Sequence, residues 1–409
     1  MISLPCIIDI VFERAKKYLP FIEKNESFLV IEILNKFIRI TSLIVNFPAK
    51  KLKVDNCLIA NHKLENQIAA LGLVKGLLNK FGRLDKYKII ASLDSSLATT
   101  VHRSVVLNRD NYKSQIDEAD LNNKIAQGIW KLFDKGRGEA AAKMGVSDLD
   151  VTLTDVRVKS ISLDGHKVSN PLGFKAHTIG IQFCQTFNPR SFIFELKKII
   201  PADRLVFITE NGSAVSDVLT KIGKDNFLLI DLLRDKTSVF LTKDRSIFYL
   251  SSFPWGKDNL LSSIKEAFSV SSNVAEKIFR IYLTKNASPT FLKSIEKLLS
   301  EKFMDFADLI SNTCKASSPP LLYLISSFSL PEFVLNSGIR TNMKRKLKFK
   351  LAHHGFIGEH FDFNLELDEN LARNNQLPAL SAFLGFYFLP SDDNINKIAK
   401  RHARWLIIQ

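Results

Sequence analysis

The stretch that decides the fold reads Phe227-Leu-Leu-Ile-Asp231, then Leu232-Leu233-Arg234-Asp235-Lys236-Thr237, then Ser238-Val239-Phe240-Leu241. An apolar run that ends in Asp, a short turn and a second apolar run predict a strand–turn–strand hairpin. Such a hairpin grips phosphate when its turn carries glycines, because a residue without Cβ lets backbone N–H groups close around phosphate oxygens. This turn has Leu, Leu, Arg, Asp and Lys instead. The sequence therefore keeps the hairpin and lacks the phosphate cradle.

Length and composition set the outer limits. A chain of 409 residues is too long for one ordinary core, so we expect two or more lobes. Its 46% hydrophobic and 24% charged residues are typical of a folded globular protein. No run approaches the roughly 20 apolar residues that span a bilayer, and the first ten residues lack the basic leader of a signal peptide.

The formal charge of +15 is compatible with nucleic acid, an anionic membrane surface or simple solubility. The lysines are scattered rather than interleaved with aromatic residues on one face, so we do not expect nucleic-acid binding. The four cysteines form no CxxC pair, which predicts free thiols in a reducing compartment. His353, His354 and His360 lie near Glu359, but neighbouring strand residues point to opposite faces, so we expect no metal site.

Apolar runs along the chain alternate with helical patterns. We expect a helix at 8–18, three strands at 28–33, 37–45 and 52–60, a helix from 64 to 81, and a strand at 88–93. The block at 99–187 has strands around a long helix (117–136) and is predicted to be an insertion. Further on, residues 347–351 and 361–367 are predicted to form a hairpin and 382–389 a final strand. The pattern predicts a two-lobed α/β protein.

Four patches resemble FtsA, the bacterial cell-division protein of the actin-like ATPase superfamily, to which the pilus-assembly protein PilM also belongs. They are Asp155–Gly173, with its Asp164-Gly165 and Asn170-Pro171-Leu172-Gly173 turns; Ile116–Leu121; the 227–283 segment, including Ala275-Glu276; and Leu377–Gly385, similar to the closing strand of the family. The resemblance implies the two-lobed actin-like ATPase (ribonuclease H-like) fold with an FtsA-type inserted α+β subdomain.

The resemblance also implies domain boundaries. The first-lobe core would begin at 1–98, followed by the insert at 99–187 and a first-lobe connection at 188–203. The second lobe would comprise core segments at 204–261 and 316–345 around a helical subdomain at 262–315. Residues 346–390 would return to the first lobe, and 391–409 would form a C-terminal amphipathic helix.

The departures from the family concern the nucleotide site. The first phosphate loop reads Glu32-Ile33-Leu34 in place of Asp-hydrophobic-Gly, and the family's second-loop glycines fall on Leu233, Arg234 and Asp235. Ser326-Ser327 stand where the adenosine strand ends in Gly-Gly, and Phe279 replaces a lysine of the helix that begins near Glu276. Side chains there would collide with phosphate, and Glu32 and Asp235 would repel it. We expect a pseudo-ATPase with no catalytic residue and no cofactor, ATP included.

Asp231 keeps the family's carboxylate. It could position Mg²⁺ or a water, but one carboxylate cannot hold Mg²⁺ and ATP without the cradle. The alternative is a strand-end carboxylate that caps the turn. Arg234 and Lys236 could grip an anion, or they could form a solvated turn tip.

The tail is amphipathic. Ile395, Ile398, Trp405 and Leu406 lie on one helical face with His402, while Lys397, Lys400, Arg401 and Arg404 lie around the other. This pattern suits a helix in an anionic membrane interface, as in FtsA-type proteins. It equally suits a helix docked on the protein's own body, and the linker before it, about five residues, is shorter than a flexible tether needs.

The leading hypothesis is a non-catalytic FtsA-like scaffold or adaptor in cell division, cytoplasmic or peripheral at the inner face of the membrane. Its implied partner is the tubulin-like division polymer, bound around 262–315, with later division proteins or a neighbouring subunit on the insert. One alternative is a PilM-like cytoplasmic platform for type IV pilus assembly. Another is a divergent ATP-binding actin homologue. A docked tail and a peptide groove beside the insert would favour the pilus role.

Overall fold

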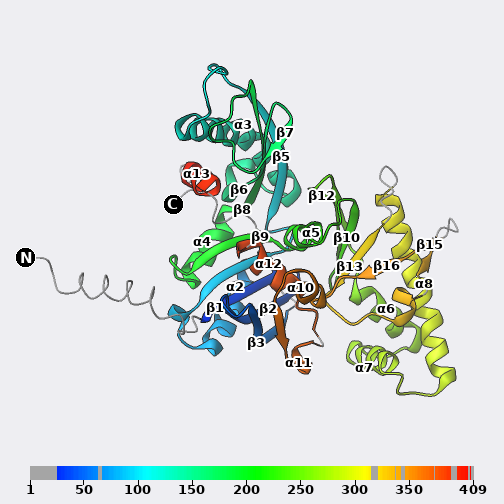
Figure 1. The fold of residues 1–409 in the computed structure, drawn as a ribbon. Coiled ribbons are helices and arrows are strands. Elements are labelled where there is room, and N and C mark those ends of the chain that lie inside the picture. The colour runs from blue at the N-terminus through cyan, green and yellow to red at the C-terminus, as the bar shows by residue number, and fades with distance from the viewer. Residues whose placement is uncertain are drawn as a thin grey trace, which may run out of the picture.

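The computed structural model describes residues 25–62, 67–314, 321–336, 338–341, 346–372, 374–387, 394–403 and 406. The predicted helix at 8–18 lies outside these residues. The described chain forms two sheet-and-helix lobes, and a third unit projects from the first lobe (Figure 1).

The first lobe is built on a six-stranded sheet in the order β17-β3-β2-β1-β4-β9. Its strands are β1 (Asn25–Leu34), β2 (Phe37–Asn46), β3 (Lys51–Asn61), β4 (Lys88–Leu93), β9 (Leu205–Glu210) and β17 (Asn364–Leu367). β1, β2 and β3 form an antiparallel meander, while β4 and β9 add in parallel. β1 is apolar on both faces because helices cover both sides of the sheet.

The second lobe repeats this topology in a five-stranded sheet, β12-β11-β10-β13-β16. Its strands are β10 (Phe227–Leu232), β11 (Thr237–Lys243), β12 (Ser246–Phe253), β13 (Leu322–Ser326) and β16 (Phe349–Leu351). Again a three-stranded meander is extended by two parallel strands. β14 (Ile339–Arg340) and β15 (Lys346–Leu347) form a separate pair. The β1–β2 and β10–β11 turns thus occupy equivalent positions in the two lobes.

Helices fill the space between the sheets and cover their outer faces. α5 (Asn211–Lys221) and α12 (Leu377–Tyr387) lie in the core shared by both sheets. α2 (Gln67–Leu78) and α4 (Arg190–Ile199) cover the first sheet, and α6 (Lys257–Phe268), α7 (Ser272–Leu283) and α8 (Pro289–Thr313) cover the second. Three short helices complete the lobes: α9 (Glu332–Asn336), α10 (Gly355–His360) and α11 (Glu369–Ala372).

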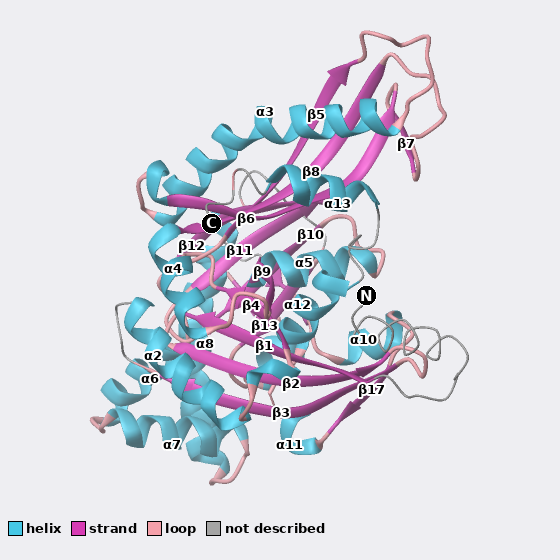
Figure 2. Ribbon diagram, turned by 90° about the vertical axis from the view of Figure 1, so that its left-hand side faces the viewer, coloured by secondary structure: helices cyan, strands magenta, loops and turns pink. Residues whose placement is uncertain are grey.

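The projecting unit is a four-stranded sheet, β5-β8-β6-β7, with one long helix on it. Its elements are β5 (Thr99–Asn108), α3 (Glu118–Met144), β6 (Val151–Leu163), β7 (His166–Val168) and β8 (Thr178–Pro189). α3 approaches the sheet closely at Gly128, where an added Cβ would lie 2.7 Å from the Phe183 ring. α13 (Asn394–Ala403) packs against the same unit, as both ribbon views show (Figure 2).

Three sequence predictions are wrong. Residues 347–351 and 361–367 do not form a hairpin, because β16 pairs with β13 in the second lobe while β17 pairs with β3 in the first. The return to the first lobe therefore comes after Leu351, not at 346. Residues 382–387 of the predicted final strand at 382–389 belong to α12, in which Leu377–Gly385 are buried all round, and 388–389 lie outside the described residues. A helix buried on every side has no apolar stripe to distinguish it from a strand.

Candidate functional site

The β1–β2 and β10–β11 turns meet at the cleft between the lobes. Leu34 and Phe37 from the first turn and Leu233 from the second form a small buried apolar cluster. These are the turns that the resemblance assigns to phosphate. Leu34 and Leu233, which stand at two of the family's phosphate-loop glycines, therefore lie against each other across the cleft.

Asp235 joins the same two turns by polar contacts. The Asn35 amide donates hydrogen bonds of 3.0 and 2.9 Å to its two carboxylate oxygens, and the Lys36 ammonium lies 3.0 Å from Oδ2. Asp235 comes from the second lobe, whereas Asn35 and Lys36 come from the first. The carboxylate that was expected to repel phosphate instead binds a cation and an amide of the opposite lobe.

A second contact between the lobes involves Lys236, which is a buried ion-pair partner rather than the solvated turn tip considered above. Its ammonium donates to Asp94, which follows β4, and both side chains are largely buried. Burial alone would raise the pKa of Asp94, but the charge and hydrogen bond of Lys236 outweigh it and hold that pKa below its usual value. Ser95 and Ser238 form a further contact of 3.1 Å.

The β10–β11 turn also packs against the N-terminal turn of α6. The Asp258 N–H donates a 2.7 Å hydrogen bond to the carbonyl oxygen of Arg234. A Cβ on Gly256 would lie 2.5 Å from that same oxygen, so the close approach requires glycine. Helix N-termini can bind anions through free N–H groups, but here the turn's own carbonyls take those donors.

Asp231 lies buried at the end of β10. The Asn211 amide donates a 3.1 Å hydrogen bond to it, and Asn211 in turn contacts Ser92 at 3.1 Å. Burial raises the pKa of Asp231 to about 7, although the hydrogen bond from Asn211 opposes the shift. The hydrogen bond to its carboxylate thus comes from the first residue of α5.

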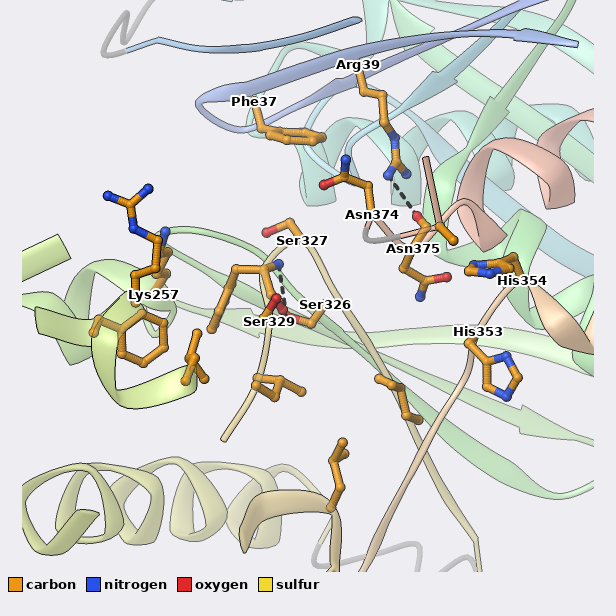
Figure 3. Close-up of a pocket in the computed structure, with 18 of the residues that line it drawn as sticks. Phe37, Arg39, Lys257, Ser326, Ser327, Ser329, His353, His354, Asn374 and Asn375 are labelled. Atoms are coloured by element: carbon orange, nitrogen blue, oxygen red, sulfur yellow. Dashed lines mark hydrogen bonds between the residues drawn. The ribbon is translucent and has the colours of Figure 1, made fainter. Parts of the chain in front are cut away.

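Glu32 is buried, and its carboxylate binds Arg39, its cross-strand neighbour. Arg39 donates through both Nε and Nη2 to the carboxylate, with 2.6 Å from Nη2 to Oε1. The same guanidinium donates from Nη1 to the carbonyl oxygen of Asn375 at 2.7 Å, as Figure 3 shows. Glu32 therefore has no free oxygen pair to offer a cation.

On the other side of these contacts the cleft opens into a cavity of about 600 Å³. Ser326 and Ser327 line it together with Glu276, while Phe37 and Arg39 form its first-lobe wall (Figure 3). Other lining residues include Phe279, Leu283, His353, His354 and Asn374. Glu276 pairs with Lys257, and Arg234 pairs with Asp258 at 2.9 Å. The nine positions singled out from the sequence (Glu32, Leu34, Asp231, Leu233, Arg234, Asp235, Glu276, Ser326, Ser327) thus surround one cleft.

Sequence reasoning missed four residues that complete the contacts between the lobes: Asn35, Lys36, Asp94 and Asn211. Asp94 and Asn211 are polar residues directly after β4 and β9, a position that marks a strand end. That signal indicates where they lie and not what they bind. Among the described residues, no group of three or more His, Cys, Asp or Glu side chains is placed to hold a metal ion.

The C-terminal tail is docked in this structure. Ile395 is 7% exposed, Ala399 is fully buried and Leu406 is 9% exposed in the core of the projecting unit. Asn396 accepts from the Val158 N–H at 2.8 Å and donates to its carbonyl at 3.3 Å.

Of the other residues predicted to contact membrane, Ile398 and Lys400 are half-buried and Arg401 is exposed. Arg404 and Trp405 lie outside the described residues. The apolar face of the described tail therefore packs inward, which is the docked arrangement that the sequence left open. No helix in the described part of the chain is long and apolar enough to cross a membrane.

No family model matches the sequence, and no curated protein matches it. Solved structures do match it. A chain of the PilM–PilN type IV pilus biogenesis complex matches with a TM-score of 0.53 and 13% identity, over 90% of this chain and 99% of that one. The ethanolamine utilization protein EutJ from Carboxydothermus hydrogenoformans matches at a TM-score of 0.39 and 9% identity, over 88% and 90%. MreB 5 of Spiroplasma citri bound to AMPPNP matches at 0.38 and 9%, over 89% and 97%.

The repeated strand order, the inserted unit and the match over nearly the whole length of the PilM–PilN complex chain agree. They confirm the predicted fold class and not the FtsA assignment. The chain has the actin-like ATPase fold.

Proposed function

We propose that this protein is a non-catalytic actin-fold scaffold that recruits protein partners, as a PilM-like platform does. The observation that carries the proposal is the direct contact between the β1–β2 and β10–β11 turns. Leu34, Phe37 and Leu233 fill the place where two glycine-rich turns would enclose phosphate.

The electrostatics of the cleft support the same proposal. A triphosphate would have to separate Leu34 from Leu233 and break the contacts of Asp235 with Asn35 and Lys36. It would then meet the carboxylate of Asp235 released from its two partners, and like charges repel. The Asp235–Lys36 pair is partly exposed, so its loss costs about 1 kcal/mol, and the separation of the apolar cluster adds to that cost. These costs oppose nucleotide binding.

Two further observations favour a pilus-type platform over a division adaptor. The amphipathic tail is docked, so its apolar face is not available to a membrane in this arrangement. A groove of about 1,070 Å³ lies beside the inserted unit. These are the two features that the sequence analysis named as favouring the pilus role. The matched chain comes from a PilM–PilN type IV pilus biogenesis complex.

Titration calorimetry with Mg²⁺-ATP tests the non-catalytic part of the proposal. We expect no binding at micromolar ATP, and no change in melting temperature with millimolar Mg²⁺-ATP. The control is the Asp231→Ala variant under the same conditions. Micromolar binding to the wild type that is lost in Asp231→Ala would instead support the divergent ATP-binding alternative.

Liposome co-sedimentation tests the division alternative. Anionic vesicles should not sediment the full chain any more than they sediment a chain ending at Pro390. Since removal of α13 uncovers core residues of the projecting unit, a second variant, Ile395→Asp, should be compared with the full chain after its folding has been checked. Tail-dependent sedimentation of the full chain would favour the division adaptor.

A further inference from the structure

The projecting unit contacts both lobes, although the chain connects it only to the first. β5 follows β4 of the first lobe, and β8 runs directly into α4 on the same lobe. From this unit, Gln182 donates a 2.9 Å hydrogen bond through Nε2 to the Ser246 hydroxyl at the start of β12. β5 also lies beside β12, which is a strand of the second lobe (Figure 1). The projecting unit therefore bridges the two lobes.

Lys143, in the last turn of α3, joins all three parts of the molecule. Its ammonium lies 2.5 Å from Oε1 of Glu210, at the end of β9 in the first lobe. Oε2 of the same carboxylate accepts a 2.8 Å hydrogen bond from the Thr100 N–H of β5. The Lys143 ammonium also lies 3.8 Å from the centre of the Tyr249 ring, on β12 of the second lobe. A cation is attracted to the face of an aromatic ring, most strongly where water is excluded. We refer to Lys143, Glu210 and Tyr249 as the three-way junction.

The three-way junction lies close to the ion pair that closes the cleft. The side chains of Lys143 and Glu210 are 9% and 1% exposed. Burial lowers the pKa of Lys143 and Glu210 opposes that shift, while the charges of Asp94 and Lys236 act on it as well. Four buried charges, two of each sign, thus meet where three parts of the chain come together. A buried charge that loses its partner is costly, so this arrangement resists displacement of any of the three parts.

The boundary between the projecting unit and α5 is polar. The unit has a hydrophobic core of its own, distinct from the core that the two sheets share. Across the boundary, Lys159 pairs with Asp217 at 2.6 Å, and His102 lies 3.4 Å from Ser213. Separate cores that meet at a polar boundary are typical of domains that move relative to one another. The contacts at the three-way junction therefore have a movement to restrain.

We propose that the projecting unit locks the angle between the two lobes, with Lys143 as the residue that couples the unit to both. Rotation of the second lobe as a rigid body would draw Tyr249 away from Lys143 and Ser246 away from Gln182. The contact between Lys143 and Glu210 would survive that rotation. Displacement of the unit by a bound partner would release the lobes in the same way. The lock goes beyond the proposed platform function and does not depend on whether the cleft binds nucleotide.

Distances between spin labels, measured by double electron–electron resonance on the full-length protein, test the lock. Labels are attached through unnatural amino acids at three exposed positions: Lys80 in the first lobe, Lys297 on α8 in the second lobe, and Lys131 on α3. The Lys80–Lys297 pair reports the lobe–lobe distance, and the Lys80–Lys131 pair reports the unit–lobe distance. Both distance distributions should be narrow in the wild type.

The double variant Tyr249→Leu/Gln182→Ala removes two contacts of the unit with the second lobe and keeps the pair of Lys143 with Glu210. It should widen the lobe–lobe distribution by about twofold or more and leave the unit–lobe distribution unchanged. Lys143→Met, which keeps the aliphatic part of the side chain, should widen the lobe–lobe distribution to a similar extent. The matched control is Lys135→Met, a change at an exposed lysine of the same helix, which should alter neither distribution.

Circular dichroism and melting temperature verify that each variant is folded. Because Lys143→Met leaves buried Glu210 without its cation, the double variant decides the outcome if Lys143→Met does not fold. A lobe–lobe distribution of wild-type width in the folded double variant would overturn the lock. Equal widening in Lys135→Met, or widening of the unit–lobe distribution in the double variant, would overturn it as well. Tight Mg²⁺-ATP binding in the calorimetric test would remove the non-catalytic scaffold and leave these distances unaffected, so the two failures are distinguishable.

Discussion

The two ends of the cleft between the lobes differ in what fills them. At one end the β1–β2 and β10–β11 turns touch through Leu34, Phe37 and Leu233, and Asp235 and Lys236 pair across the lobes. At the other end Ser326 and Ser327 line a cavity of about 600 Å³. The closed end is the one that the family resemblance assigns to phosphate, and the open end is the one it assigns to adenosine.

Because one end is filled by side chains and the other holds a cavity, the cleft has not collapsed as a whole. At its closed end, side chains of the two lobes contact each other directly, and we interpret these contacts as the ones that hold the lobes together. If that interpretation is right, stability should depend strongly on the closed end and weakly on the open end.

The largest effect is expected from the buried ion pair at the closed end. Asp94→Ala leaves the ammonium of Lys236, whose side chain is 16% exposed, without its carboxylate. Loss of one member of a buried pair costs about 3–5 kcal/mol of unfolding free energy. Urea titration measures this loss.

The matched control is Asp305→Ala, which removes an exposed pair with Lys302 on α8. Exposed pairs contribute little, so its urea midpoint should hardly change. Equal stability of Asp94→Ala and the wild type would show that the closed end does not hold the lobes together.

Asp231 gives a pH-dependent test of the same end. Its pKa in the folded protein is about 7, against about 3.9 for an unfolded chain. Between pH 4 and 7 the unfolded carboxyl therefore ionises while the folded one stays protonated. Stability contributed by this group falls as pH rises through that window and levels off above it.

Asp231→Asn keeps the shape and removes the ionisation. It should stabilise the protein by up to about 4 kcal/mol at pH 8 and leave it nearly unchanged at pH 4, measured as urea midpoints at both values. A stabilisation of the same size at both pH values would argue against a raised pKa in the folded state.

The sequence predicted the elements of the closed end but not its contacts. The hairpin at 227–241 was predictable because two apolar runs flank a polar turn, and its missing glycines were visible directly. The contacts were not, since Asn35 and Asp235 are 200 residues apart, and Asp94 and Lys236 are 142 apart. Pairing over such separations depends on how two lobes face each other, which local patterns do not encode.

Errors in the predicted elements have a different cause. α12 was predicted as a strand because Leu377–Gly385 are buried all round, so the apolar run has no helical stripe. β16 has three residues and belongs to the opposite lobe from β17. Two short strands that follow each other in the sequence are easily predicted to form a hairpin, even when they join different sheets.

Asp235→Ala should have a smaller effect than the two preceding changes. It removes the contacts with Asn35 and Lys36, whose ammonium side chain is 33% exposed. Partial exposure screens the pair, so we expect a loss of about 1 kcal/mol. A double-mutant cycle with Lys36→Ala isolates the energy of the ion pair. A coupling energy near zero would show that the Asp235–Lys36 pair does not stabilise the contact between the lobes.

The smallest effect is expected at the open end. Asn374 lines the cavity, is exposed, and lies beside Arg39 in Figure 3. Asn374→Ala should change the urea midpoint by an amount equivalent to less than about 0.5 kcal/mol, because a surface side chain away from buried networks contributes little. Arg39→Ala should cost more for a reason internal to the first lobe, since it leaves buried Glu32 without its partner and breaks no contact between the lobes. A loss at Asn374 as large as at Arg39 would mean that the open end also holds the lobes together, and the difference between the two ends would disappear.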